Sequence, residues 1–190
     1  MVRFAAWGAA IAVVVSGIAA ANELKIGDKA PAFVVTGTDG KEYSLEQLSK
    51  DADVVVICFT CSSCPVAQAY EERLIEFNKA YQGKKVAFVA VNSNTGTEDL
   101  EGMKSRAKEK GYNFLYAFDG SGKAAAEYGA RVTPEFFILK GGKLAYHGAF
   151  DDKQKDPSES YVTQAVDALL AGKAPEVAET KAFGCGIKSK

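Results

Sequence analysis

Histidine is nearly absent from this sequence and cysteine is scarce, with one and four residues respectively among 190. Cys58, Cys61 and Cys64 form one overlapping C-x-x-C-x-x-C run, but the sequence has no histidine pair and no second, separate Cys-x-x-Cys pair, and so contains no complete set of ligands for a tetrahedral zinc site. An excess of either charge is also absent, since the formal net charge is −1 and no run of like charge occurs. The composition therefore indicates no general attraction to nucleic acid or to a charged membrane surface.

The first 21 residues have the features of a secretory signal. Arg3 is the only positive charge of a short amino-terminal region, and Phe4 to Val15 form an apolar stretch. Small residues follow, so we expect cleavage after Ala21 and an exported, periplasmic or otherwise extracytoplasmic mature protein. The alternative is an uncleaved membrane anchor, for which the apolar stretch is short compared with about 20 residues.

The rest of the chain has the length of one domain, without internal repeats. We divide it into a domain of residues 22–173 and a tail of residues 174–190 that contains Cys185. Apolar runs and turn signals predict strands at 33–36, 43–45, 54–59, 85–91, 114–118, 136–139 and 143–147, and helices at 44–48, 66–82, 98–110, 123–128 and 160–170. Helical crossovers between strands indicate an α/β fold with helices on both faces of the sheet, and the final hairpin makes that sheet mixed.

The stretch VVVICFTCSSCP at residues 54–65 is the most informative part of the sequence. A buried strand ends there, Cys61 and Cys64 lie on a turn, and helical periodicity begins at Val66. The amides and the macrodipole of a helix amino terminus stabilise a thiolate and lower a cysteine pKa from about 8.5. The arrangement favours redox thiols, although a static disulfide or half of a zinc site would give the same pattern.

Two separated motifs carry a family resemblance. Cys61-Ser62-Ser63-Cys64-Pro65 lies between a central strand and a helix, and Thr133-Pro134 lies far downstream, just before another strand. With these motifs the chain resembles the thioredoxin-fold redoxin family, which contains peroxiredoxins and exported thiol-disulfide oxidoreductases. The resemblance implies a thioredoxin-like three-layer α/β/α sandwich with a mixed central sheet. It also implies a cis Thr133-Pro134 bond in a loop that faces the cysteines.

The resemblance also implies roles for these residues in an exported thiol-disulfide oxidoreductase. Cys61, the more exposed cysteine of such turns, would attack a partner disulfide, and Cys64 would resolve the mixed disulfide. The backbone of Thr133 and Pro134 would bind an extended segment of the partner. The expected partners are protein thiols or disulfides and an upstream redox protein. No cofactor, metal, nucleic acid or membrane contact after signal cleavage is expected.

Two more cysteines and the single histidine lie outside these motifs. Cys58 lies inside an apolar strand and is interpreted as a buried hydrophobe. His147 is interpreted as structural. Cys185 could resolve an intermediate of Cys61 or Cys64, join two chains or simply be exposed, and we favour a redox role. The carboxylates that serve as proton acceptors in relatives would fall at Val55 and Ala67, so the sequence identifies no base.

Two alternative functions share parts of the pattern. In a peroxiredoxin-like thiol peroxidase, Cys64 would be the peroxidatic cysteine and Cys61 or Cys185 would resolve it. However, Cys61 occupies the position expected for a threonine, and Arg131 is out of register with the expected arginine. A copper-binding protein similar to the Sco proteins would use cysteine thiolates for Cu(I). That family has one more residue between its cysteines, and its histidine precedes the strand that His147 follows.

Overall fold

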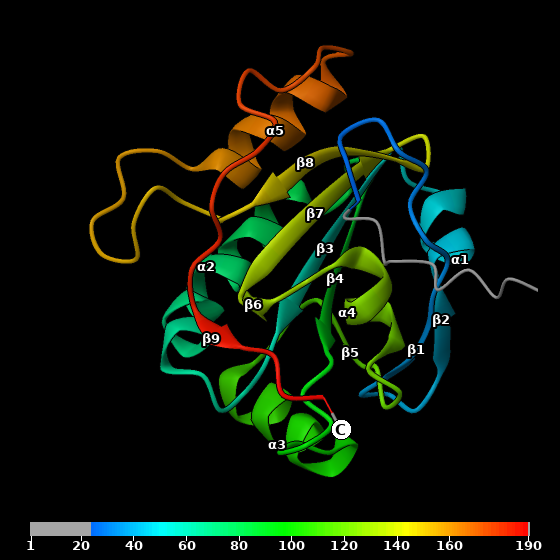
Figure 1. Ribbon diagram of the computed structural model, residues 1–190, viewed down its shortest axis with the longest axis vertical. Coiled ribbons are helices and arrows are strands. Elements are labelled where there is room, and N and C mark those ends of the chain that lie inside the picture. Colours follow the sequence, from blue (N-terminus) through cyan, green and yellow to red (C-terminus); the bar gives the residue numbers. More distant parts are fainter. Residues whose placement is uncertain (1–23, 190) are drawn as a thin grey trace, which may run out of the picture.

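A mixed sheet of seven strands forms the centre of the molecule (Figure 1). The structure is a computed structural model that describes residues 24–189. The spatial order is β2-β1-β5-β4-β3-β7-β8. These strands are β1 (Val34–Gly37), β2 (Glu42–Ser44), β3 (Val54–Thr60), β4 (Val86–Asn92), β5 (Leu115–Phe118), β7 (Glu135–Lys140) and β8 (Lys143–Gly148). Strand β4 is parallel to both of its neighbours, β3 and β5, and every other pair of neighbouring strands in this sheet is antiparallel.

Helices cover both faces of the sheet. They are α1 (Leu45–Lys50), α2 (Pro65–Tyr81), α3 (Leu100–Lys110), α4 (Lys123–Tyr128) and α5 (Tyr161–Leu170). The core of one face includes side chains from α2, α3 and α5, and that of the other includes side chains from α1 and α4. The predicted three-layer α/β/α sandwich with a mixed sheet is therefore confirmed. Among the described residues, no helix is both long and apolar enough to cross a membrane.

Strand β3 shows why this sheet is buried on both sides. All seven of its residues are buried. Because successive side chains of a strand point to opposite faces, Val54, Val56 and Cys58 join one core, while Ile57 and Phe59 join the other. A strand in this position needs apolar residues at every place, which explains the continuous apolar run.

Several local predictions are confirmed. The Asp39-Gly40 turn joins β1 to β2, and Ser44 caps α1 in a reciprocal capping box with Gln47. Helix α3, however, begins at Leu100 rather than at residue 98. The Asp99 side chain accepts a hydrogen bond from the Gly102 amide at 2.8 Å and is the N-cap. Glu98 therefore lies in the loop before the helix, where its side chain can turn toward the cysteines.

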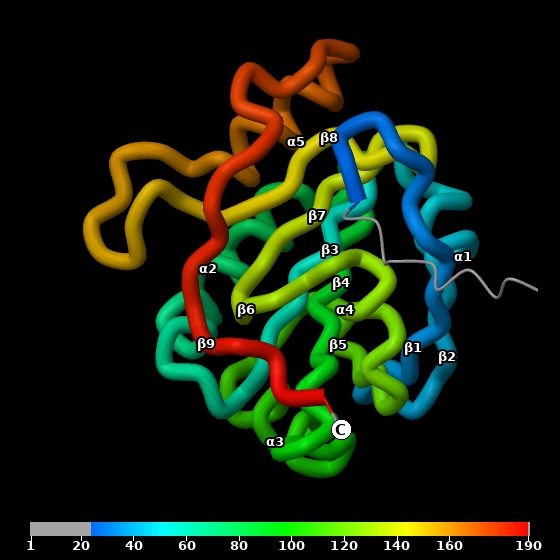
Figure 2. Tube along the Cα trace, viewed as in Figure 1, coloured from blue at the N-terminus to red at the C-terminus, as the bar shows by residue number. Residues whose placement is uncertain are grey.

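The tail after α5 follows a definite path along the molecule (Figure 2). It first adds to the edge of β8, where the His147 amide donates to Ala178 O and the Thr180 amide donates to His147 O, both at 3.0 Å. It then forms β9 (Cys185–Gly186), which pairs with β6 (Val132–Thr133) in a separate two-stranded antiparallel sheet. The tail thus packs on the domain, and it reaches the loop that precedes Pro134. The predicted signal of residues 1–21 lies outside the described residues.

Candidate functional site

The two cysteines of the CSSC turn lie at the carboxyl end of β3 and the amino end of α2. Cys64 is the N-cap of α2, Pro65 begins the helix, and the Ala67 amide donates to Cys64 Sγ at 3.5 Å. Proline suits the first helical position because its missing N–H would have no partner there. The Cys64 sulfur thus lies at the positive end of the helix dipole, where negative charge on sulfur is stabilised.

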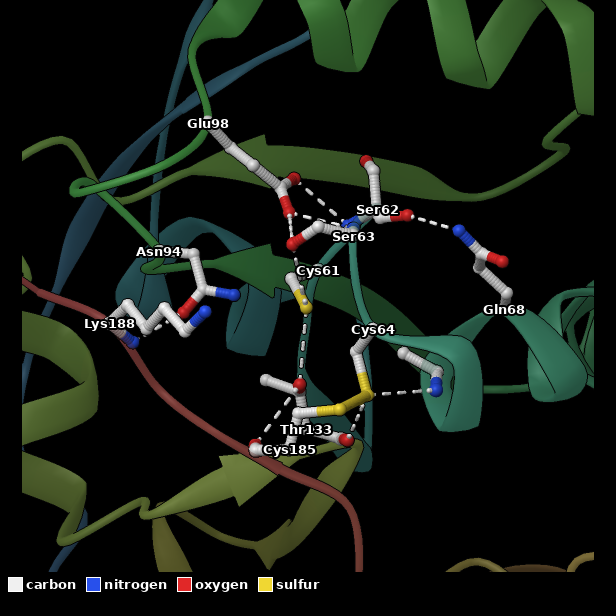
Figure 3. The surroundings of a disulfide bond; sticks show 11 residues. Cys61, Ser62, Ser63, Cys64, Gln68, Asn94, Glu98, Thr133, Cys185 and Lys188 are labelled. Atoms are coloured by element: carbon white, nitrogen blue, oxygen red, sulfur yellow. Dashed lines mark hydrogen bonds between the residues drawn. A yellow bond between two sulfur atoms is a disulfide. The ribbon is translucent and has the colours of Figure 1, made fainter.

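Thr133 connects both cysteines to the loop that contains Pro134 (Figure 3). Its hydroxyl oxygen lies 3.2 Å from Cys61 Sγ, and its carbonyl oxygen lies 3.3 Å from Cys64 Sγ. The Thr133-Pro134 bond is cis, as the family resemblance implied. The structure therefore brings together the two motifs, which are about 70 residues apart in sequence.

The disulfide joins Cys64 to Cys185, while Cys61 is a free thiol. The expected bond between Cys61 and Cys64 is therefore not the one that this structure contains. The reason is the register of the small sheet, in which Cys185 is the partner of Thr133 and so lies beside Cys64. Cys61 is also not an exposed thiol, because only 4% of its surface is accessible, compared with 2% for Cys64.

Glu98 holds the CSSC turn from the loop before α3. Its carboxylate accepts hydrogen bonds from the Ser62 amide at 2.9 Å and from the Ser63 amide at 2.8 Å. It also accepts from the Ser63 hydroxyl at 2.7 Å and from the Asn92 side chain at 2.6 Å. Ser63 Oγ is 3.9 Å from Cys61 Sγ. One carboxylate therefore fixes the backbone between the two cysteines.

These hydrogen bonds determine the ionisation of Glu98. Partial burial raises the pKa of this carboxyl, but the bonds from Ser63, Ser62 and Asn92 to the charged form are stronger together, so the pKa is lowered below its usual value. Glu98 is thus a carboxylate near neutral pH. Sequence periodicity missed it because residues 98–110 have a helical pattern with a charged face.

Glu135 holds the second loop in the same way. Its carboxylate accepts from the Arg131 amide at 2.7 Å, from the Val132 amide at 3.1 Å and from His147 Nε2 at 2.7 Å. Burial raises the pKa of Glu135, while the bonds from His147 and the two amides lower it, with a net lowering. His147 also stacks on Phe137, at 4.3 Å between ring centroids. The structural interpretation of His147 fits these contacts.

Cys58 is the other free thiol of the structure. Cys58 is fully buried, and burial, followed by the nearby Cys61, raises its pKa well above the usual value. It is a core residue, as its position in β3 suggested.

Within residues 24–189, no group of three or more histidine, cysteine, aspartate or glutamate side chains is placed so that it could hold a metal ion. His147 in particular contacts Glu135 rather than the cysteines.

Replacing Glu98 with glutamine should destabilise the protein at neutral pH by about 1 to 2 kcal/mol, because charged hydrogen bonds to the turn are lost. The folded state lowers the Glu98 pKa, so the wild-type advantage should be present above the usual value of 4.5 and disappear as the pH falls below it. Urea unfolding of both proteins from pH 7 to pH 3 measures this difference. Glu101→Gln, on the exposed side of α3, is the control, and a wild-type advantage that does not change with pH would contradict the prediction.

Comparison with known proteins agrees with this fold and site. The Redoxin family model matches residues 25–165. The thiol-disulfide oxidoreductase ResA of Bacillus anthracis is 27% identical over 142 residues, which cover 74% of this chain and 79% of that protein. Two solved structures have a TM-score of 0.81. A hypothetical protein of Sinorhizobium meliloti is 32% identical over 89% of this chain and 97% of its own, and an uncharacterised conserved protein of Geobacillus kaustophilus is 34% identical over 89% and 94%. The chain belongs to the Redoxin family.

Proposed function

We propose that this protein is a thiol-disulfide oxidoreductase that exchanges disulfides with partner proteins through Cys61 and Cys64. The observation that carries the proposal is the position of both sulfur atoms against Thr133, within 3.3 Å of its hydroxyl or carbonyl oxygen. Exchange needs two thiols within reach of each other and a surface that aligns a third sulfur with them. The similarity to ResA supports the same reaction type.

The reaction proceeds in two exchanges. The Cys61 thiolate attacks one sulfur of a partner disulfide, forming a mixed disulfide and releasing a partner thiolate, which takes up a proton. The Cys64 thiolate then attacks the Cys61 sulfur, forming the Cys61–Cys64 disulfide and releasing the second partner thiol. The partner is reduced and the protein is oxidised, and the reverse sequence oxidises a partner dithiol. An upstream redox protein restores the starting state.

The partner would bind in an extended conformation along Val132 and Thr133. Backbone pairing with these residues is already used by β9, which occupies this edge as an antiparallel strand. If an extended segment of the partner binds there in the register of β9, its cysteine lies near Thr133 and therefore near both sulfurs of the turn. Recognition by backbone hydrogen bonds explains how such a site accepts several sequences.

Reduction of insulin disulfides by the full chain, driven by excess dithiothreitol, tests the proposal. Cys61→Ser should lower the rate by at least about a hundredfold, because the attacking thiolate is lost. In a separate incubation with insulin but without dithiothreitol, pre-reduced Cys64→Ser should accumulate a mixed disulfide at Cys61, which mass spectrometry detects, because the resolving thiol of the CSSC turn is missing. Cys58→Ala, which removes the buried thiol of β3 three residues before Cys61, is the matched control and should keep the wild-type rate. Exchange that survives Cys61→Ser at the wild-type rate would refute the assigned roles.

We also propose that the mature protein works outside the cytoplasm. The sequence of residues 1–21 supports export, and an oxidising compartment permits a disulfide such as Cys64–Cys185 to persist. The amino-terminal sequence of the exported protein should begin at Asn22. A cytoplasmic protein that retains Met1 would contradict this placement.

One observation favours a second function, that of a thiol peroxidase. The Cys64–Cys185 disulfide is the bond that a peroxidatic Cys64 and a resolving Cys185 would form. The Cys64 thiolate would attack a peroxide oxygen, giving a sulfenic acid and releasing hydroxide or alkoxide, which takes up a proton from water. The Cys185 thiol would then condense with this sulfenic acid, releasing water. Cys64 at the N-cap of α2 has a suitable position for such a thiolate.

Hydrogen peroxide separates the two functions. If peroxidase activity is the main function, the Cys61→Ser/Cys185→Ser double variant, which lacks both possible resolving thiols, should carry the dimedone adduct on Cys64 after treatment with peroxide and dimedone, found by peptide mass spectrometry. The thiol-disulfide oxidoreductase proposal predicts no more adduct on Cys64 than on Cys58, the buried control thiol. Rapid adduct formation confined to Cys64, together with absent insulin reduction, would replace the oxidoreductase proposal by the peroxidase.

A further inference from the structure

The end of the chain occupies the surface where a partner would bind. Cys185 and Gly186 pair with Thr133 and Val132, so this segment lies as an antiparallel strand on the loop before Pro134 (Figure 3). The Thr133 hydroxyl also lies 3.4 Å from Cys185 O. The sulfur of this strand is bonded to Cys64. A segment of this chain thus has the backbone pairing and the disulfide expected of a bound partner.

Hydrogen bonds also hold the residues that follow Cys185. The Ile187 amide donates to Arg131 O at 3.0 Å, and the Lys188 amide donates to Asn94 Oδ1 at 2.6 Å. The Gly96 amide in turn donates to Lys188 O at 2.9 Å. The segment is therefore seated by its backbone from residue 185 to residue 188. Hydrogen bonds of this kind recognise an extended backbone and depend little on the side chains of the bound segment.

Gly184 is the position where side-chain size matters. A Cβ atom there would overlap the carbonyl group of Thr133, and this overlap is with backbone that cannot turn away. At Gly186, two residues later, the nearest atom to such a Cβ is Arg131 O at 4.0 Å, which is ordinary contact. The close approach of the tail to Thr133 therefore requires glycine before the cysteine but not after it.

We propose that residues 184–188 are a tethered partner segment whose Cys185 shares one disulfide with Cys61 and Cys64 by exchange within the chain. This inference rests on the proposed disulfide-exchange function and adds a third cysteine to it. In the closed form the bond joins Cys64 to Cys185, Cys61 is a thiol and the tail covers the partner site. In the open form the bond joins Cys61 to Cys64, and Cys185 is a thiol on a released tail.

The conversion is a single thiol-disulfide exchange. The Cys61 thiolate attacks Cys64 Sγ, the Cys61–Cys64 bond forms, and the Cys64–Cys185 bond breaks. Cys185 leaves as a thiolate and takes up a proton, so the chain has the same number of disulfides before and after. Cys61 and Cys64 pack in one small cluster, with Cys185 against it, which provides the proximity for this step. No external oxidant or reductant is required.

The position of the free thiol identifies each form. The oxidised full chain is equilibrated in a glutathione buffer, quenched with acid, unfolded and labelled with a maleimide. Label on Cys61 reports the closed form and label on Cys185 reports the open form, while Cys58 is labelled in both and serves as an internal standard. The wild type should carry the label mainly on Cys61.

Gly184→Ala should shift the ratio of label on Cys185 to label on Cys61 by at least about tenfold, because the tail can no longer seat. Gly186→Ala, the same change two residues away, should keep the wild-type ratio. Lys188→Pro removes the amide that donates to Asn94 and should shift the ratio in the same direction as Gly184→Ala. Circular dichroism of each variant verifies that the domain is folded.

Three results would overturn the inference: equal label ratios in the wild type and Gly184→Ala, wild-type label confined to Cys185, or a Cys64–Cys185 bond that joins two chains on non-reducing electrophoresis. Insulin reduction by Cys185→Ser separates this failure from failure of the proposed function. If that variant reduces insulin while the label ratios do not move, the exchange function stands and the tethered segment is refuted. If no variant reduces insulin, the exchange function itself is refuted.

Discussion

The site depends on Thr133, through both its backbone and its side chain. This residue offers its hydroxyl toward Cys61, its carbonyl toward Cys64 and its strand edge to Cys185. The next residue, Pro134, has no amide hydrogen, so the strand pairing ends there and the chain turns into β7. Three sulfurs, two from the CSSC turn and one from the tail, therefore meet at one residue. Any segment that pairs with this edge in the same register must carry its sulfur to the same place.

Two carboxylates keep the two halves of this site in position. Glu98 accepts the amides of Ser62 and Ser63, and Glu135 accepts the amides of Arg131 and Val132. Each therefore fixes a loop mainly by its backbone and makes no hydrogen bond to Cys61, Cys64 or Thr133. Bonds from neutral amides to an ionised carboxylate are stronger than those between neutral groups. Both carboxyl pKa values are lowered accordingly. An ionised carboxylate thus supports both the cysteine turn and the Thr133 loop.

The sequence predicted most of the fold, since strand and helix periodicities are local properties. The apolar run of β3, the capping box at Ser44 and the two motifs were readable because each depends on neighbours in the chain. The choice of disulfide partner was not readable, because it depends on the register between β6 and β9, which involves residues about 50 apart. Glu98 was missed for a related reason. A charged residue at the start of a helical pattern looks like part of a solvent face, and only the N-cap at Asp99 shows that the helix begins after it.

A tethered cysteine also changes how a free partner competes for the site. Attachment within the same chain gives Cys185 a local concentration on the order of millimolar, well above that of a typical partner protein. A partner therefore meets an occupied strand edge unless the tail has been released, and release by attack of Cys61 forms the Cys61–Cys64 bond at the same moment. The exchange that frees this edge is thus the one that prepares the oxidised pair. Because Gly184 is needed only for close seating of the tail, the balance between the two forms can be altered without touching any sulfur.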